Sequence, residues 1–318
     1  MIRYPITLAE LERKVDALAP TWRARAKTRT NKFQAAGKYS EPPSAIWSEV
    51  KPIYMEIQHN KCAYCERRLA SASFGGAVEH DLEHFRPKSS VVDWPDATAF
   101  TFSTGTASAA GYFWLAYHLL NYSASCKKCN SGLKLNYFPV GAIRGAAAND
   151  PISLVDLEKP FLIYPIGDID DDPQELITFL GLNAISVKRT GPKRRRADVT
   201  IAFFRLNDSD REELFRGRAE RLRELGTSLE TINDPGTSEA RKTIAKRDIE
   251  QMIRPSSEHV SCVRAMIGMY EADTPQARML IGAARDYLDS VGCAHPFCTA
   301  NPLAVQPDQP PSMLMTFV

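Results

Sequence analysis

Two Cys-x-x-Cys pairs constrain this 318-residue chain more than any other feature of its sequence. The first pair is Cys62 and Cys65, and the second is Cys126 and Cys129. Each pair can form a tight knuckle with two thiolates on one side of a metal, and two knuckles close a tetrahedron with no position left for substrate. Such a site contributes folding energy to a segment too short to bury a large core. The sequence therefore predicts a structural zinc held by these four cysteines.

Two other interpretations of the pairs are a redox dithiol and chance. A redox motif needs only one pair, in a strand–helix context, so we favour zinc. The long separation of Cys65 from Cys126 argues against an ordinary zinc ribbon. Five further residues could suggest a second metal site: His259, Cys262, Cys293, His295 and Cys298. Their spacing is irregular, so we favour isolated core and surface residues instead.

Composition and charge limit the class of protein. Hydrophobic residues make up 44% of the chain and charged residues 25%, as in soluble globular proteins. No signal peptide or bilayer-spanning run is apparent, and the odd count of seven cysteines suits a reducing compartment, so we expect a cytoplasmic protein without a membrane partner. The net charge of +2 implies that any nucleic-acid-binding surface is local.

The residue pattern predicts an α+β, predominantly helical fold in four regions. The first is an N-terminal helical region (residues 1–58), and the second is a nuclease-like domain rich in glycine, cysteine and aromatic residues (59–140). A mixed region of short strands (141–206) and a C-terminal helical region (207–318) follow. Thr7 with Glu10 and Ser209 with Glu212 fit capping boxes at two helix starts. The apolar run Ile177–Leu180 is typical of a short strand.

The segment Asp81–Lys88, between the two knuckles, carries residues suited to phosphodiester hydrolysis. That reaction needs a base to activate water, a divalent cation to stabilise charge, and cations to hold the backbone. His84 can be the base, because imidazole titrates near neutral pH. Glu83 and Asn130 offer hard oxygen ligands, which suit magnesium or manganese. Asn130 directly follows Cys129, so the second knuckle fixes its position.

Three segments resemble HNH endonucleases, above all the PtuB-type subgroup of Septu anti-phage systems and of some retrons. They are Glu83–Lys88, Tyr112–Tyr117 with Asn121, and Ser125–Asn130 followed by Phe138 and Pro139. The resemblance is specific over residues 61–140 and looser over residues 158–207. It implies a ββα-metal fold, in which a hairpin carries the histidine and a helix starts near the last cysteine. It also implies a DNA-cleaving defence effector that works with an ATPase partner of the PtuA kind.

Carried over position by position, the resemblance assigns roles to four residues. His84 takes the place of the general base, and Asn121 that of the middle asparagine that orients it. Glu83 takes the place of the acidic metal ligand, and Asn130 is the third motif residue. Many HNH enzymes have aspartate before the histidine, whereas this chain has glutamate, so Asp81 remains a rival ligand.

Several cationic side chains are candidates for binding phosphate. Arg86, Lys88 and Lys134 lie close to the motif residues, and we expect them to contact phosphates, although they can also be simply solvated. The basic run over residues 188–196 either binds a nucleic-acid backbone or forms a solvated loop, and the sequence does not decide between these.

Two other functions fit the same residues. One is a zinc-dependent nucleic-acid-binding module without catalysis, in which binding does not depend on the acid–base residues. The other is a partner-binding protein whose helices over residues 207–295 dock on another subunit, and this function is compatible with nuclease activity. The leading prediction is a DNA endonuclease with a structural zinc and a catalytic magnesium or manganese ion.

Overall fold

The structure is a computed structural model that describes residues 1–42, 44–70 and 80–292. These residues form many helices and two small antiparallel sheets, which confirms the predicted α+β, predominantly helical fold. Within them, no helix is long and apolar enough to cross a membrane. The C-terminal tail and three residues of the second metal site that we considered lie outside the described residues: Cys293, His295 and Cys298.

The N-terminal region is helical, as predicted. Its elements are α1 (Leu8–Leu18), α2 (Trp22–Ala36), the 3-10 turn η1 (Trp47–Val50) and α3 (Lys51–Ile57). The capping box at α1 is confirmed, because the Thr7 hydroxyl accepts from the backbone of Glu10 while the Glu10 carboxylate accepts from the backbone of Thr7. Helix α3 packs against the sheet that carries the motif residues, so this region forms one wall beside them.

The central sheet pairs β1 (His80–His84) with β2 (Tyr122–Cys126) in antiparallel register. His84 lies opposite Tyr122, and His80 lies opposite Cys126. The strands are not joined by a tight hairpin, since residues 85–121 lie between them as loops and short 3-10 turns. A helical turn, η7 (Lys128–Lys134), follows β2 directly. The sheet therefore brings His84 and the second knuckle into one unit.

The middle region combines short helices with a true hairpin. It contains α4 (Pro151–Glu158), α5 (Pro173–Leu176), β3 (Ile177–Leu180), β4 (Asn183–Ser186) and α6 (Gly191–Phe203). Strand β3 has the predicted bounds and pairs with β4. The tight turn between them uses Gly181 at φ +58°, a left-handed conformation that glycine adopts without strain.

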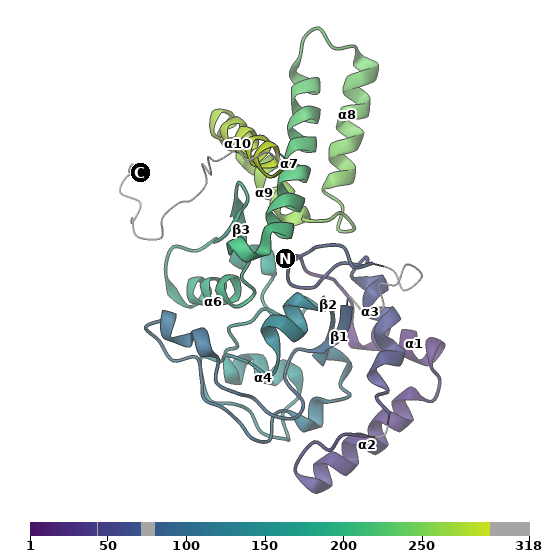
Figure 1. The fold of residues 1–318 in the computed structure, drawn as a ribbon. Coiled ribbons are helices and arrows are strands. Elements are labelled where there is room, and N and C mark those ends of the chain that lie inside the picture. The colour runs from purple at the N-terminus through teal and green to yellow at the C-terminus, as the bar shows by residue number, and fades with distance from the viewer. Residues whose placement is uncertain (43, 71–79, 293–318) are drawn as a thin grey trace.

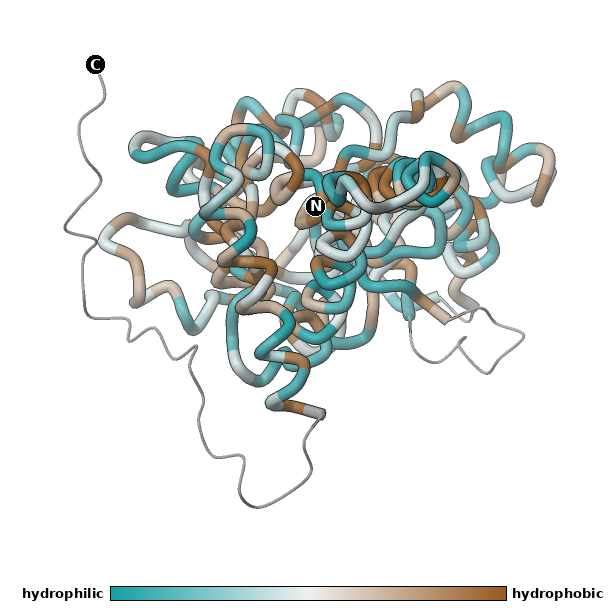
Figure 2. Tube along the Cα trace, turned by 90° about the horizontal axis from the view of Figure 1, so that it is seen from above, coloured by the Kyte–Doolittle hydropathy of each residue, from teal (hydrophilic) through white to brown (hydrophobic). Residues whose placement is uncertain are grey.

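Four helices make up the C-terminal region: α7 (Glu212–Asn233), α8 (Glu239–Met252), α9 (Val260–Ala272) and α10 (Thr274–Gly292). Helices α7 and α8 lie side by side and extend away from β1 and β2 (Figure 1). Hydrophobic and hydrophilic residues alternate along the helices (Figure 2), and α7 buries one face through Leu214, Leu222 and Leu225. The capping box predicted at Ser209 is wrong, because Ser209 begins a separate 3-10 turn and caps no helix.

Candidate metal centre and active-site cleft

The four knuckle cysteines converge in the interior. Their sulfur atoms all lie within 4.8 Å of one another, and all four residues are buried. The Sγ atoms of Cys65 and Cys126 are 3.8 Å apart. Two thiolates on a tetrahedral zinc, each bonded at about 2.3 Å, have a separation of about 3.8 Å. The donor set and its spacing therefore fit a four-thiolate metal site, as the sequence predicted.

Backbone contacts hold both knuckles beside the sheet. The amide of Ala63, inside the first knuckle, donates to the carbonyl of Ala124 on β2 at 3.0 Å. In the second knuckle, the amide of Cys129 donates to the Sγ of Cys126 at 3.5 Å. Glu66 ends the first knuckle in a left-handed conformation at φ 60°. Because β2 ends in the second knuckle, the cysteine cluster sets where the following residues lie.

A polar cleft of about 320 Å³ opens beside β1. It brings together four of the predicted site residues that remain partly exposed: Asp81, His84, Lys88 and Asn130. A fifth predicted site residue, the more enclosed Glu83, also lines it, as do residues of the loops that follow β1 and η7. The sequence analysis missed three further lining residues: Trp47, Ser48 and Lys51. Those three precede the first knuckle and have no motif spacing, so no pattern in the sequence connects them to the cleft.

The His84 ring has a defined orientation. Its Nε2 lies 3.0 Å from the carbonyl oxygen of Ala116. A carbonyl can only accept, so Nε2 carries the hydrogen and the neutral ring keeps its lone pair on Nδ1. The rings of Trp47 and Tyr122 stand edge-on to the imidazole, at centroid distances of 5.2 and 5.1 Å. Burial, together with the nearby Lys88 ammonium, lowers the pKa of His84 to about 3, which keeps the ring neutral at pH 7.

Asn121 links the two segments that position this histidine. Its Oδ1 accepts from the amide of Arg86 at 2.8 Å, and its Nδ2 donates to the carbonyl of Arg86 at 3.1 Å. The same Nδ2 also donates to the carbonyl of Leu115 at 3.1 Å, next to Ala116. Asn121 thus links the segment just after His84 to the segment whose carbonyl binds the His84 ring. This geometry suits the orienting role predicted for Asn121, exerted through the backbone.

Asp81 lies at the cleft beside the third motif residue. One of its carboxylate oxygens accepts from Nδ2 of Asn130 at 2.9 Å. The other pairs with the ammonium of Lys127 at 2.7 Å, and about a quarter of the Asp81 side chain remains exposed (27%). Two oxygen-bearing side chains therefore meet at the cleft wall, where an added cation can reach them from solvent.

Glu83 lines the same cleft, but its side chain is held by internal partners. Its side chain is almost fully enclosed, and one oxygen pairs with the ammonium of Lys134 at 2.6 Å. The other oxygen accepts from the hydroxyl of Tyr64 at 2.7 Å. Lys134 is enclosed as well and also donates to the carbonyl of His84 at 2.9 Å. In this conformation, Glu83 and Lys134 tie β1 to its surroundings, and Asp81 is the acid that faces Asn130.

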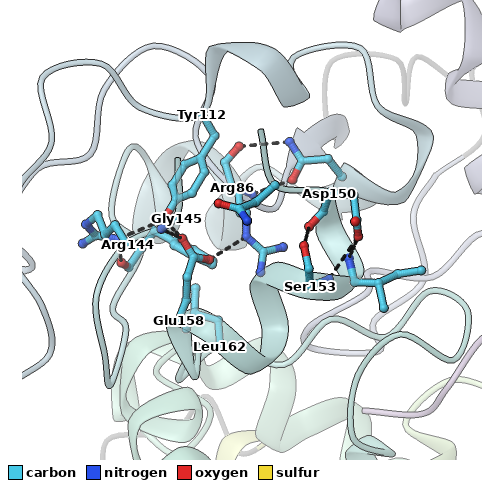
Figure 3. Close-up of polar contacts among 12 residues, drawn as sticks. Arg86, Tyr112, Arg144, Gly145, Asp150, Ser153, Glu158 and Leu162 are labelled. Carbon is cyan, nitrogen blue, oxygen red and sulfur yellow. Dashed lines mark hydrogen bonds and ion pairs between the residues drawn. The ribbon is translucent and has the colours of Figure 1, made fainter. Parts of the chain in front are cut away.

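Arg86 also lies inside the protein. Its side chain is fully buried, and Nε donates to Glu158 at 2.8 Å. Glu158 accepts as well from the hydroxyl of Tyr112 at 2.6 Å and from the amide of Gly145 at 2.9 Å (Figure 3). Of the three cations expected to contact phosphate, only Lys88 lines the cleft, and the geometry of Arg86 and Lys134 favours a structural role.

The basic run over residues 188–196 lies at the start of α6 among acidic neighbours. Lys193 pairs with Asp171 at 3.1 Å, and Arg196 pairs with both Asp170 and Asp171. Much of its charge is therefore balanced within the protein. His259 and Cys262 are buried, and neither belongs to a metal-binding group among the residues that the structure describes.

Comparison with known proteins gives one informative similarity. No family model and no solved structure matches the chain. The chain is 26% identical over 246 residues to "Septu protein PtuB" of Bacillus mycoides (strain KBAB4), which covers 75% of this chain and 74% of that protein. This similarity confirms the resemblance to PtuB-type proteins predicted from the motifs.

Proposed function

We propose that the chain is a divalent-metal-dependent HNH endonuclease that hydrolyses DNA phosphodiester bonds as the effector of a bacterial anti-phage defence system. The observation that carries the proposal is the cleft, where a neutral, oriented His84 lies near the Asp81–Asn130 pair. The similarity to a Septu protein supports the role in defence. The order β1, β2, η7 matches that of a ββα-metal motif, and it supports the HNH assignment.

In this proposal His84 is the general base. Its Nδ1 accepts a proton from water as the water oxygen attacks phosphorus, and the bond from phosphorus to the leaving oxygen breaks. Asn130 and an acidic side chain would hold magnesium or manganese, and the bound ion would supply charge stabilisation for the phosphate and the leaving oxygen. The geometry favours Asp81 over Glu83 as that acid, because Glu83 is already paired inside the protein.

The four cysteines would hold zinc as a scaffold. Zinc suits a closed set of four thiolates, whereas a catalytic ion needs an open position. Because Cys129 and Asn130 are adjacent, a rigid knuckle would keep the asparagine at the cleft without taking part in the reaction.

The partner that we propose is an ATPase subunit of the PtuA kind, docked on the C-terminal helices. The extension of α7 and α8 away from β1 and β2 supports this (Figure 1), since a partner there would leave the cleft beside β1 open to DNA. Co-purification with and without residues 207–292 tests the interface. Retention of the partner by the shortened chain would rule it out.

The decisive experiment is a plasmid cleavage assay with added magnesium or manganese. His84→Ala should lower the cleavage rate by about 10²- to 10⁴-fold, because it removes the base. Asp81→Asn should lower it by about 100-fold, because an amide is a weaker ligand for a hard cation. His59→Ala, at an exposed position away from the cleft, is the matched control and should cleave normally. Undiminished cleavage by His84→Ala would refute the mechanism, and DNA binding without cleavage by the parent would favour the binding module.

A further inference from the structure

Arg211, just before α7, is fully buried next to the cysteine cluster. Its side chain has no exposed surface, and Nη2 lies 3.7 Å from the Sγ of Cys129. Nη1 donates to the carbonyl of Phe204 at 2.6 Å, and Nε donates to Glu213 at 2.8 Å. The guanidinium group thus uses all three nitrogens, and one of them points at a metal-ligand candidate.

The burial of this cation needs a counter-charge. A buried guanidinium group is costly unless it is paired, and the carboxylate partner of Arg211, Glu213, remains 41% exposed. Four thiolates around a divalent metal carry about two net negative charges, whereas four neutral thiols carry none. The environment of Arg211 is therefore the one that a loaded metal centre provides.

We propose that Arg211 is a positioning residue of the metal centre, which donates a hydrogen bond to the metal-bound Cys129 thiolate and fastens the C-terminal helices to it. The inference rests on the structural zinc of the proposed function. Groups that hydrogen-bond metal ligands fix their orientation and slow the loss of the metal. Arg211 would thus both stabilise the metal site and join the C-terminal helices to the cysteine cluster.

A series of contacts also links Arg211 to β1, the strand that carries His84. Phe204, whose carbonyl binds Arg211, stacks on Tyr64 with a centroid distance of 4.1 Å and an interplanar angle of 15°. Tyr64 lies between the two cysteines of the first knuckle and donates to Glu83 on β1. Arg211 thus contacts the second knuckle directly, and through Phe204 and Tyr64 it is linked to the first knuckle and to the strand that carries His84.

A second set of contacts supports this junction independently of the metal. The ammonium of Lys61 donates to the carbonyl of Ser257 at 2.9 Å, and the amide of Arg68 donates to the carboxylate of Glu258 at 2.8 Å. Glu66, at the end of the first knuckle, accepts from the backbone amide of Ser261 at 3.2 Å. Both flanks of the first knuckle therefore bind the segment that leads into α9.

The test measures metal loss from the full-length chain. Purified parent, Arg211→Gln and Arg211→Lys are mixed with excess EDTA, and zinc remaining on the protein is measured over time after desalting. Arg211→Gln should lose zinc about 10 to 100 times faster than the parent. Arg211→Lys keeps the charge without the planar fork of donors, so it should fall between the two. Arg216→Gln is the matched control, because Arg216 is exposed and pairs with the exposed Glu212, and it should match the parent.

Each outcome separates this inference from the proposed function. A well-folded parent that holds no zinc would refute the structural zinc itself, and with it the basis of the inference. A parent that holds zinc and an Arg211→Gln variant that loses it at the parental rate would overturn the role of Arg211 alone. If Arg211→Gln does not fold, Arg211→Lys decides: faster loss than the parent supports the role, and equal loss overturns it.

Discussion

The cysteine cluster and the cleft lie side by side but are built in opposite ways. All four cysteines are buried, and their sulfur atoms face only one another and the protein. In the cleft, Asp81, His84 and Asn130 remain partly exposed and line an open volume of about 320 Å³. A closed donor set suits a scaffold, and an open polar set suits a reaction. The difference indicates that the cleft, rather than the cysteine cluster, is the place to look for chemistry.

The boundary between these regions runs between residues close together in sequence. Cys129 is buried and Asn130 is partly exposed, although they are adjacent. On β1, Asp81 and Glu83 lie two residues apart and both line the cleft, yet Asp81 is partly exposed whereas Glu83 is enclosed and paired with Lys134. The comparison therefore predicts that substitutions on the closed side reduce stability, whereas substitutions on the open side reduce activity.

The largest effect is expected at the cysteine cluster. Cys126→Ser removes one thiolate, so the chain should lose its metal and much of the free energy of unfolding that metal binding supplies, which is about 10 kcal/mol or more for structural zinc. Metal content and thermal unfolding measure this. Cys262→Ser, at a buried cysteine outside the cluster, is the control and should keep the metal. A Cys126→Ser protein as stable as the parent would mean that the cluster is no scaffold.

An intermediate effect is expected at Glu83. Glu83→Gln leaves the Lys134 ammonium buried beside a neutral amide, and breaking a buried pair costs about 3–5 kcal/mol. Asp81→Asn is the control, because its ion pair with Lys127 is exposed and is worth about 1 kcal/mol or less. Urea unfolding compares the two variants. If Asp81→Asn proved the more destabilising, the boundary drawn along β1 would be wrong.

The sequence predicted those parts of the site that depend on spacing. Two Cys-x-x-Cys pairs can converge because each knuckle is local, and the cluster has the predicted members. The choice between Asp81 and Glu83 was beyond the sequence. Both are acids at alternate positions of one strand, and what separates them is their partners, Asn130 and Lys134, which a different segment brings to them.

Long-range partners explain the other limits of sequence reasoning. Arg86 resembled a phosphate ligand, but its carboxylate partner is Glu158, 72 residues away. The two capping boxes differ for a related reason. At Thr7 the whole box is local, so the pattern was sufficient. At Ser209, the chain runs through a 3-10 turn, and α7 starts only after the buried Arg211, which contacts the distant Cys129.

The smallest effect is expected at Lys88, on the open side. Its ammonium lies over the rings of Trp47 and Tyr39, at 4.9 and 5.1 Å from their centroids. If it contacts one phosphate, Lys88→Met should weaken DNA binding by about threefold to tenfold and reduce the slope of log affinity against log salt by about 0.9. Binding titrations with His84→Ala as the background avoid cleavage. Lys246→Met, on the exposed surface of α8, should change neither quantity. An unchanged slope for Lys88→Met would place the DNA backbone away from this end of the cleft.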